Sequence, residues 1–172
     1  MIAENPAEAQ VMVTRLANLL RHNLQRDPQH TAPLAREVEI VCDYLALESA
    51  RFEERLRVEV QIGPGAADIP VPTMLLQTLV ENGLKHGIRP LTEGGDLWIR
   101  AHVRQDTLVI EVENPGRLEN SQSDGTGVGL RNAHERLRLL YGGRAELRLA
   151  GRANARVQAT IEIPIAHEGP NS

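Results

Sequence analysis

The chain has little cysteine and no long apolar run. A single thiol, Cys42, in 172 residues excludes an internal disulfide framework and a cysteine-rich metal site. Because Cys42 falls on the apolar stripe of an expected helix, we expect a buried, inert thiol. No apolar run approaches the roughly 18 to 20 residues that a membrane-spanning helix needs, and the N-terminus lacks the features of a signal peptide. We therefore expect a soluble, cytoplasmic chain, which includes the case of a cytoplasmic part of a membrane protein.

The chain also lacks an excess of positive charge. It has 19 Lys and Arg against 23 Asp and Glu, a formal net charge of -4, and so has no electrostatic footprint for nucleic acid. No direct nucleic-acid partner is expected. Hydrophobic residues make up 41% and charged residues 24%, which is typical of a globular protein with one substantial core.

Hydrophobic periodicity divides the chain into helices and strands. Apolar residues at three- and four-residue spacing predict amphipathic helices at about residues 6–26, 33–54, 72–86 and 128–141. Pro33 is expected at the first position of the second helix. Alternating apolar and polar residues predict strands near 56–62, 97–103, 108–112, 145–149 and 157–165. This order predicts an α+β fold, with a mixed sheet that has one polar face and helices packed on the other.

The expected third helix presents polar residues on one face. Thr78, Asn82 and Lys85 are spaced by four and three residues, while apolar residues on the other faces serve the core. The amide oxygen of Asn82 is a hard, neutral ligand suited to a Mg²⁺ ion that phosphates also hold. Lys85 can reach a phosphate, with His86 packed nearby. Taken alone, Asn82 is more simply a helix residue that meets solvent, but two further motifs follow it.

These motifs complete an ordered set. Asn114 ends a buried strand, so its side chain can lie at the bottom of a pocket and accept a hydrogen bond from an exocyclic amine such as that of adenine. Gly116 lets a ring approach the backbone closely, although the competing interpretation is that this Asn-Pro-Gly segment is only a turn. Gly125, Gly127 and Gly129 then lead into the fourth helix, whose N-terminal amides form an anion site for phosphates.

The set resembles the catalytic part of a LytS/YehU-like sensor histidine kinase, within the gyrase, Hsp90, histidine kinase and MutL (GHKL) ATPase superfamily. The resemblance is carried by the segments 44–48, 51–52, 55–56, 69–72, 76–77, 79–82, 85–88, 127–132, 135–137 and 141–142. It implies a Bergerat-type ATP-binding α/β sandwich preceded by two helices of a partial dimerisation hairpin. The implied division is residues 1–54 for the helices, 55–166 for the catalytic domain and 167–172 for a frayed tail.

The resemblance also implies site residues and cofactors. Asn82 belongs to the N-box and would bind Mg²⁺, and Asn82 and Lys85 are the implied catalytic residues. The implied ATP-binding residues are Asn82, Lys85, His86, Asn114, Gly116, Gly125, Gly127, Val128, Gly129 and Leu130. Residues 117–126 are polar and glycine-containing, and we expect them to form a mobile lid over ATP.

One expected feature is missing. In such kinases the phosphoacceptor lies in a His-Phe-Asn-type motif on the first hairpin helix, and nothing here matches it; His22 and His30 are better interpreted as surface histidines. We therefore expect a truncated kinase, inactive in autophosphorylation alone, that transfers the γ-phosphoryl group of ATP to a histidine on an upstream segment. The implied full-length form is a homodimer in the cytoplasmic part of an inner-membrane sensor. Its implied partner is a response regulator, of which one type has a LytTR DNA-binding domain.

Other residues separate a kinase from an ATPase. The hydrolases of this superfamily place a general-base Glu one turn before the metal-binding Asn, and here that position is Thr78. Glu81 points about 100° away from Asn82, so we expect poor hydrolysis. Asn114 stands where the superfamily has Asp, and residues 154–156 replace a usual Gly-Thr. Two alternatives stay open: a non-catalytic nucleotide-binding or dimerising module, and an anti-sigma-type serine kinase.

Overall fold

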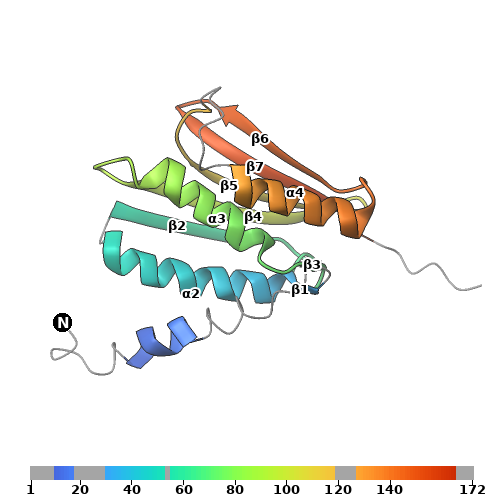
Figure 1. The fold of residues 1–172 in the computed structure, drawn as a ribbon, viewed down its shortest axis with the longest axis horizontal. Helices are drawn as coiled ribbons and strands as arrows, with labels where there is room; N and C mark the ends of the chain where they lie inside the picture. The colour runs from blue at the N-terminus through green and yellow to red at the C-terminus, as the bar shows by residue number, and fades with distance from the viewer. Residues whose placement is uncertain (1–9, 18–29, 53–54, 119–126, 166–172) are drawn as a thin grey trace, which may run out of the picture.

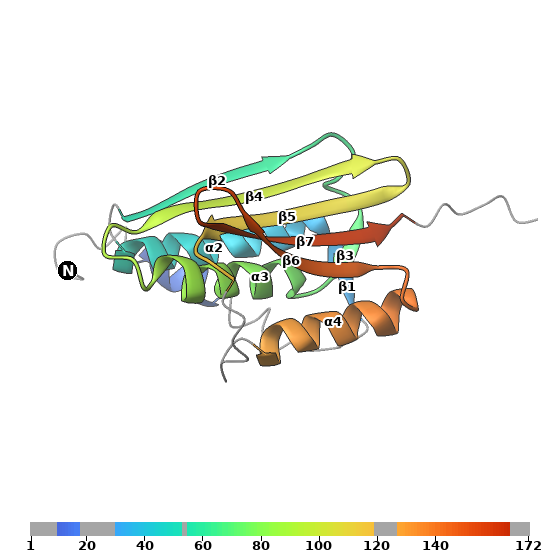
Figure 2. The same cartoon turned by 90° about the horizontal axis from the view of Figure 1, so that it is seen from above.

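The computed structural model describes residues 10–17, 30–52, 55–118 and 127–165. Within them, five strands form one sheet in the order β2-β4-β5-β7-β6, and helices α2, α3 and α4 cover one of its faces (Figures 1 and 2). The helices are α2 (Leu34–Phe52), α3 (Leu75–Gly83) and α4 (Gly127–Tyr141). The strands are β2 (Leu56–Ile62), β4 (Gly95–Arg104), β5 (Thr107–Pro115), β6 (Glu146–Arg152) and β7 (Arg156–Pro164). The predicted α+β class with a mixed sheet is confirmed.

Strand direction explains why the sheet is mixed. β2 pairs with β4 in parallel, and the chain between them crosses over through α3, whereas the other neighbours in this sheet are antiparallel. Figure 1 shows α3 lying between α2 and α4 on the sheet. The helix that carries the expected metal ligand is therefore the central helix of its layer.

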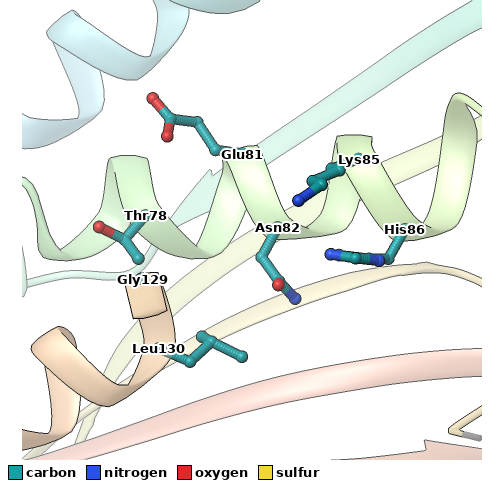
Figure 3. Close-up of a pocket in the computed structure, with 7 residues that line it drawn as sticks. All are labelled: Thr78, Glu81, Asn82, Lys85, His86, Gly129 and Leu130. Carbon is teal, nitrogen blue, oxygen red and sulfur yellow. The ribbon is translucent and has the colours of Figure 1, made fainter. Parts of the chain in front are cut away.

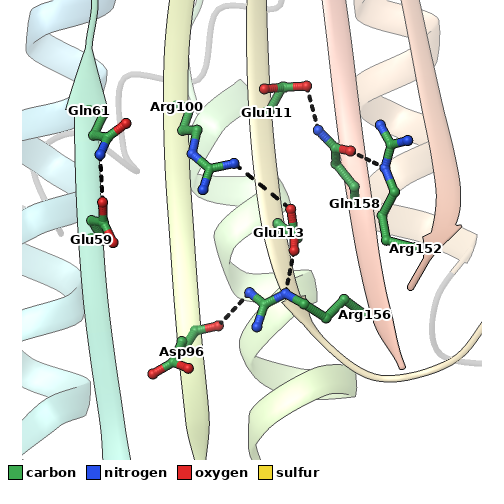
Figure 4. A network of polar contacts seen from close by, with 9 residues as sticks. All are labelled: Glu59, Gln61, Asp96, Arg100, Glu111, Glu113, Arg152, Arg156 and Gln158. Carbon is green, nitrogen blue, oxygen red and sulfur yellow. Dashed lines mark hydrogen bonds and ion pairs between the residues drawn. The ribbon is translucent and has the colours of Figure 1, made fainter. Parts of the chain in front are cut away.

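Alternation along the strands separates a buried face from a polar one. In β4 the side chains of Leu97, Ile99 and Ala101 are buried under the helices. The opposite face carries a network of ion pairs and hydrogen bonds across the strands, as in the pairing of Arg156 with Glu113 (Figure 4). The predicted polar face is confirmed, and its charged groups are held by neighbours on adjacent strands.

The helix layer and the sheet share one core. Leu34, Val41, Leu45 and Phe52 of α2 belong to the same buried cluster as the apolar residues of α3 and the sheet. The expected domain division at residue 54 stays a prediction. No helix within the described ranges combines the length and the apolar composition that a membrane crossing requires.

A small second sheet was not predicted. β1 (Thr31–Pro33) pairs antiparallel with β3 (Pro70–Pro72), and the amide N–H of Leu34 donates to the carbonyl of Ile69 at 2.9 Å. Pro33 is therefore the last residue of β1 and not the first residue of a helix, because the chain at this point pairs with another strand. For the same reason the third helix begins at Leu75 and not near Pro72.

The thiol prediction was wrong. Cys42 is exposed, because α2 turns the neighbouring Val41 and Leu45 toward the core and leaves Cys42 outside that face. The first predicted helix is observed over residues 10–17. The rest of that helix, His22, most of the expected lid and the tail lie outside the described residues, whereas His30 is described and exposed, as expected.

Candidate functional site

A hollow of about 180 Å³ lies between α3 and the start of α4. Its lining comes from α3, from the helical turn that follows it and from α4, and Figure 3 shows the residues: Thr78, Glu81, Asn82, Lys85, His86, Gly129 and Leu130. Asn82, Lys85, His86, Gly129 and Leu130 were expected from the sequence to bind a nucleotide. The structure brings these residues together from segments more than forty positions apart.

Helical geometry places Thr78 and Asn82 one above the other. They are four residues apart on α3 and face the same hollow. The hydroxyl of Thr78 donates a hydrogen bond to the carbonyl of Met74 at 2.7 Å, which is a common arrangement for threonine in a helix. Thr78 therefore presents its methyl group, and not a carboxylate, where a hydrolase would hold its general base.

Glu81 lies on another side of α3. Figure 3 shows its carboxylate projecting away from Asn82, in agreement with the angular offset expected for adjacent helix positions. The side-chain amide of Gln77 donates to this carboxylate at 2.7 Å. Although Glu81 borders the hollow, its carboxylate is held by a neighbour on its own helix and does not face the amide of Asn82.

The end of α3 widens into a π-helix, which the sequence did not reveal. Residues Leu84–Ile88 form the segment labelled η2, and the amide N–H of Arg89 donates to the carbonyl of Leu84 at 2.9 Å. A π-helical turn rotates the residues within it relative to a regular helix, and such turns occur frequently at functional sites. Here it carries Lys85 and His86, whose side chains extend toward the hollow (Figure 3).

The positive charge at the hollow comes from Lys85. Burial, and next the positive charge of Lys85, lower the pKa of the His86 imidazole below its usual value. The ring is therefore neutral at neutral pH, and the positive charge offered to an anion at this position is that of the Lys85 ammonium group.

Asn114 lies beneath the π-helical turn and does not line the hollow. Its side chain is 7% exposed, and its Nδ2 donates to the carbonyl of Pro115 at 2.7 Å. A Cβ atom on Gly83 would lie 2.9 Å from Asn114 Oδ1, and one on Gly87 would lie 2.5 Å from the Pro115 carbonyl. These two glycines, four residues apart on one helix face, make room for the asparagine. Sequence reasoning missed their role, although their spacing was a usable signal.

The glycine-containing segment begins α4 as expected. The helix starts at Gly127, Gly129 and Leu130 line the hollow, and Val128 is exposed outside it. A Cβ on Gly129 would lie 3.4 Å from the methyl group of Thr78, so α4 starts directly against α3. Gly125 lies outside the described residues.

Gly116 and the turn before β7 contact each other. Gly116 has a φ of 140°, a conformation that favours glycine, and its N–H donates to the carbonyl of Ala155 at 2.8 Å. The segment that replaces the usual Gly-Thr is therefore a direct neighbour of the predicted adenine-contacting strand end.

Comparison with known proteins identifies the family. A family model described as "Histidine kinase-, DNA gyrase B-, and HSP90-like ATPase" matches residues 67–167, and a model described as "Histidine kinase" matches residues 1–56. The first match covers more than half of the chain, which therefore belongs to this ATPase family.

Similar curated proteins are named sensor histidine kinases. The chain is 30% identical over 164 residues to the sensor histidine kinase BtsS of Escherichia coli strain K12. The aligned residues cover 95% of this chain and 29% of BtsS. It is 31% identical over 147 residues to the sensor histidine kinase YpdA of the same strain, and these residues cover 80% of this chain and 26% of YpdA. The resemblance to LytS/YehU-like sensor histidine kinases is confirmed, and the chain spans less than a third of the length of these relatives.

Solved structures agree on the fold. The histidine kinase AdeS of Acinetobacter baumannii matches with a TM-score of 0.61 at 19% identity, over 90% of this chain and 77% of that one. The catalytic domain of histidine kinase ThkA matches with a TM-score of 0.59 at 19% identity, over 78% and 94%. At this identity the likeness concerns the fold alone, and it supports the Bergerat-type architecture expected from the sequence.

Proposed function

We propose that the hollow between α3 and α4 binds the phosphates of ATP together with Mg²⁺, and that this chain is the catalytic region of a sensor histidine kinase. The observation that carries the proposal is the meeting of Asn82, Lys85 and the first turn of α4 at one hollow. An amide oxygen, an ammonium group and helix N-terminal amides are together the donor set that a metal-bound polyphosphate needs.

Each residue has a distinct role in this proposal. Asn82 holds the metal ion through its amide oxygen, and Lys85 and the backbone amides at Gly127 to Gly129 neutralise phosphate charge. Bound Mg²⁺ would supply charge neutralisation at the phosphate oxygens. His86 and Leu130 border the phosphates, and Val128 contributes its backbone. The residues named here fit such a ligand because polar side chains of α3 and of the turn after it line the hollow beside the start of α4.

Asn114 and Gly116 are proposed to bind the adenine end. The Nδ2 of Asn114 is directed to the Pro115 carbonyl, and this orientation leaves Oδ1 as the acceptor side of the amide. An acceptor is what the exocyclic amine of adenine requires. Gly125 lies outside the described residues, and its role in a lid over ATP stays a prediction from the sequence.

Thr78 supports phosphoryl transfer over hydrolysis. With a threonine one turn before Asn82, and with Glu81 held by Gln77, no carboxylate among the lining residues is directed to orient a water molecule at the γ-phosphate. The proposed acceptor is a histidine imidazole on an upstream segment of the full-length homodimer. The proposal extends to a response regulator, with a LytTR-type DNA-binding domain, as the next acceptor, and to a position at the cytoplasmic side of an inner membrane.

Titration calorimetry with a non-hydrolysable ATP analogue and Mg²⁺ tests the binding site. We expect one site, weakened by Asn82→Ala and by Asn114→Ala, and weakened when Mg²⁺ is omitted. Gln61→Ala is the matched control, because it removes an exposed amide from β2 on the opposite side of the sheet. Unchanged affinity in both asparagine variants would contradict the proposal.

Phosphotransfer separates the kinase from a non-catalytic module. A separately supplied dimerisation segment with an acceptor histidine should take acid-labile label from γ-labelled ATP in the presence of this chain. Nucleotide binding without any transfer to such a segment would favour the non-catalytic module instead.

A further inference from the structure

Glu37 is a buried acid on α2 with a partner on the segment that precedes α3. It is 1% exposed, and its Oε1 accepts a hydrogen bond from the backbone N–H of Met74 at 3.0 Å. The N–H of Leu76 also interacts with this carboxyl group. A buried carboxyl group is costly unless it is well bound, so its placement against these amides calls for a reason.

The start of α3 explains the contact. Met74, the residue before the helix, has a left-handed backbone with a φ of 62° and makes no side-chain capping hydrogen bond. The first amides of a helix have no partner within the helix, and a carboxyl group near them is favourable. Glu37 supplies from a different helix the cap that α3 does not supply for itself.

Arg136 brings α4 to the same point. Its guanidinium Nη1 donates to the carbonyl of Thr73, and its positive charge acts on the carboxyl group of Glu37. The backbone at Thr73 and Met74 is therefore held from two sides, by α2 through Glu37 and by α4 through Arg136. These three helices cover the sheet side by side (Figure 1).

This junction lies one helical turn from the hollow. Thr78 donates to the carbonyl of Met74 at 2.7 Å, and the methyl group of Thr78 meets the start of α4 at Gly129. Gly129 and Arg136 are seven residues apart and so lie on one face of α4. The contacts at Thr73 and Met74 therefore help to determine the distance between α3 and the start of α4, which line the hollow from its two sides.

We propose that Glu37 and Arg136 are positioning residues that hold α3 against α4 and thereby set the affinity of the hollow for phosphates. Neither side chain lines the hollow. The proposal rests on the proposed nucleotide site, and it assigns part of the binding affinity to a residue of α2, the helix that leads into the sheet from the N-terminal side.

Affinity and stability must be measured separately to test this. The variants are Glu37→Ala, Glu37→Gln, Arg136→Lys and Arg136→Ala, and the matched control is Val41→Ala, which shortens a buried apolar side chain of α2 and keeps the side chains that bond to Thr73 and Met74. Each variant is titrated with a non-hydrolysable ATP analogue and Mg²⁺ well below its Tm. We expect Glu37→Ala and Arg136→Ala to weaken binding by about fivefold or more, as the loss of a buried hydrogen bond implies.

The conservative variants and the control decide the outcome. Glu37→Gln keeps an oxygen acceptor for the Met74 amide and Arg136→Lys keeps a donor, so both should bind more tightly than Glu37→Ala and Arg136→Ala, which keep neither. Val41→Ala should lower the Tm and bind like the unaltered chain. Equal affinity in all variants, or an equal loss in Val41→Ala, would overturn the positioning role. Absence of binding by the unaltered chain would instead overturn the nucleotide site itself.

Discussion

Gly87 lies too close to the end of β5 to carry a side chain. The π-helical turn passes so close to the end of β5 that any side chain at this position meets Asn114 and the Pro115 carbonyl. The position therefore links the geometry of the helix that carries Lys85 to the strand end that carries Asn114. A close approach of this kind leaves glycine as the residue that fits.

Gly87→Ala should destabilise the chain and weaken nucleotide binding. Overpacking a well-filled site costs about 1 to 3 kcal/mol, and relief requires movement of Asn114 or of the helix. The control is Gly151→Ala in β6, where an added Cβ would meet only Leu118 at 4.0 Å. Urea unfolding of both variants, followed by titration with the ATP analogue, checks the prediction. Equal stability of the two variants would contradict it.

Glu37 should make stability depend on pH near neutrality. Burial raises the pKa of Glu37 to about 7 from its ordinary value of 4.5, against the lowering effects of the Met74 and Leu76 amides and of Arg136 and Arg36. Between these two values the folded chain binds more protons at this site than the unfolded chain does. Stability therefore falls as pH rises through this window, by on the order of 3 kcal/mol, and levels off above about pH 7.

Glu37→Gln removes this titration. The difference in Tm between Glu37→Gln and the unaltered chain should shift in favour of the variant from about pH 5 to about pH 8, because glutamine stays neutral at every pH. Glu39→Gln changes an exposed residue of the same helix and should show no such shift. Parallel Tm profiles for the unaltered chain and Glu37→Gln would show that Glu37 does not titrate in this range.

The turn between β6 and β7 contains two residues other than glycine in a left-handed backbone conformation. Asn154 and Ala155 both have left-handed conformations, with φ values of 59° and 52°. Asparagine tolerates this region, but alanine there costs about 1 to 2 kcal/mol. The strands on either side are well paired, and they hold the turn in place.

Ala155→Gly should stabilise the chain by about 0.5 to 1 kcal/mol. Glycine removes the left-handed cost, and its greater freedom in the unfolded state offsets part of the gain. Ala153→Gly is the control, since the backbone at residue 153 does not have a positive φ. Chemical unfolding of both variants gives the comparison, and a loss of stability in Ala155→Gly would contradict the prediction.

The longer elements could be predicted from the sequence, and the short ones could not. Alternation identified β2, β4, β5 and β7 because a half-buried strand repeats every two residues. β1 and β3 have three residues each and contain proline, so no period could be read, and their pairing depends on the fold. The π-helical turn was missed because it differs from an α-helix in hydrogen bonding and not in its apolar pattern.

At the scale of the whole molecule, the site was predictable where its residues share a helix face or belong to a glycine-containing motif. Thr78 and Asn82 share a face of α3 because they are four residues apart, and Lys85 follows on the π-helical turn that continues this helix. The junction of Glu37 with Met74 and Arg136 joins residues about a hundred positions apart, and no local pattern predicts it. The position of Asn114 beneath the helix likewise depends on how the layers pack.

This chain alone should neither label itself nor hydrolyse ATP at a useful rate. Thr78 provides no general base beside Asn82, and the chain has no His-Phe-Asn-type acceptor motif. Incubation with γ-labelled ATP should leave the chain unlabelled, with little phosphate release, whereas an added acceptor segment should become labelled. Stable label on His22 or His30, or fast phosphate release, would show that the choice of kinase over ATPase is wrong.

The polar face of the sheet has a consequence for experiments. Trp98, the only tryptophan of the chain, lies on this face. The guanidinium Cζ atoms of Arg100 and Arg156 are 4.8 and 4.0 Å from the centroid of its ring. The hollow lies between α3 and α4. These helices cover the other face of the sheet (Figure 2). Intrinsic fluorescence should therefore change when the strands separate in denaturant. The molecule therefore carries a built-in optical probe of unfolding, placed on the face of the sheet that the helices leave uncovered.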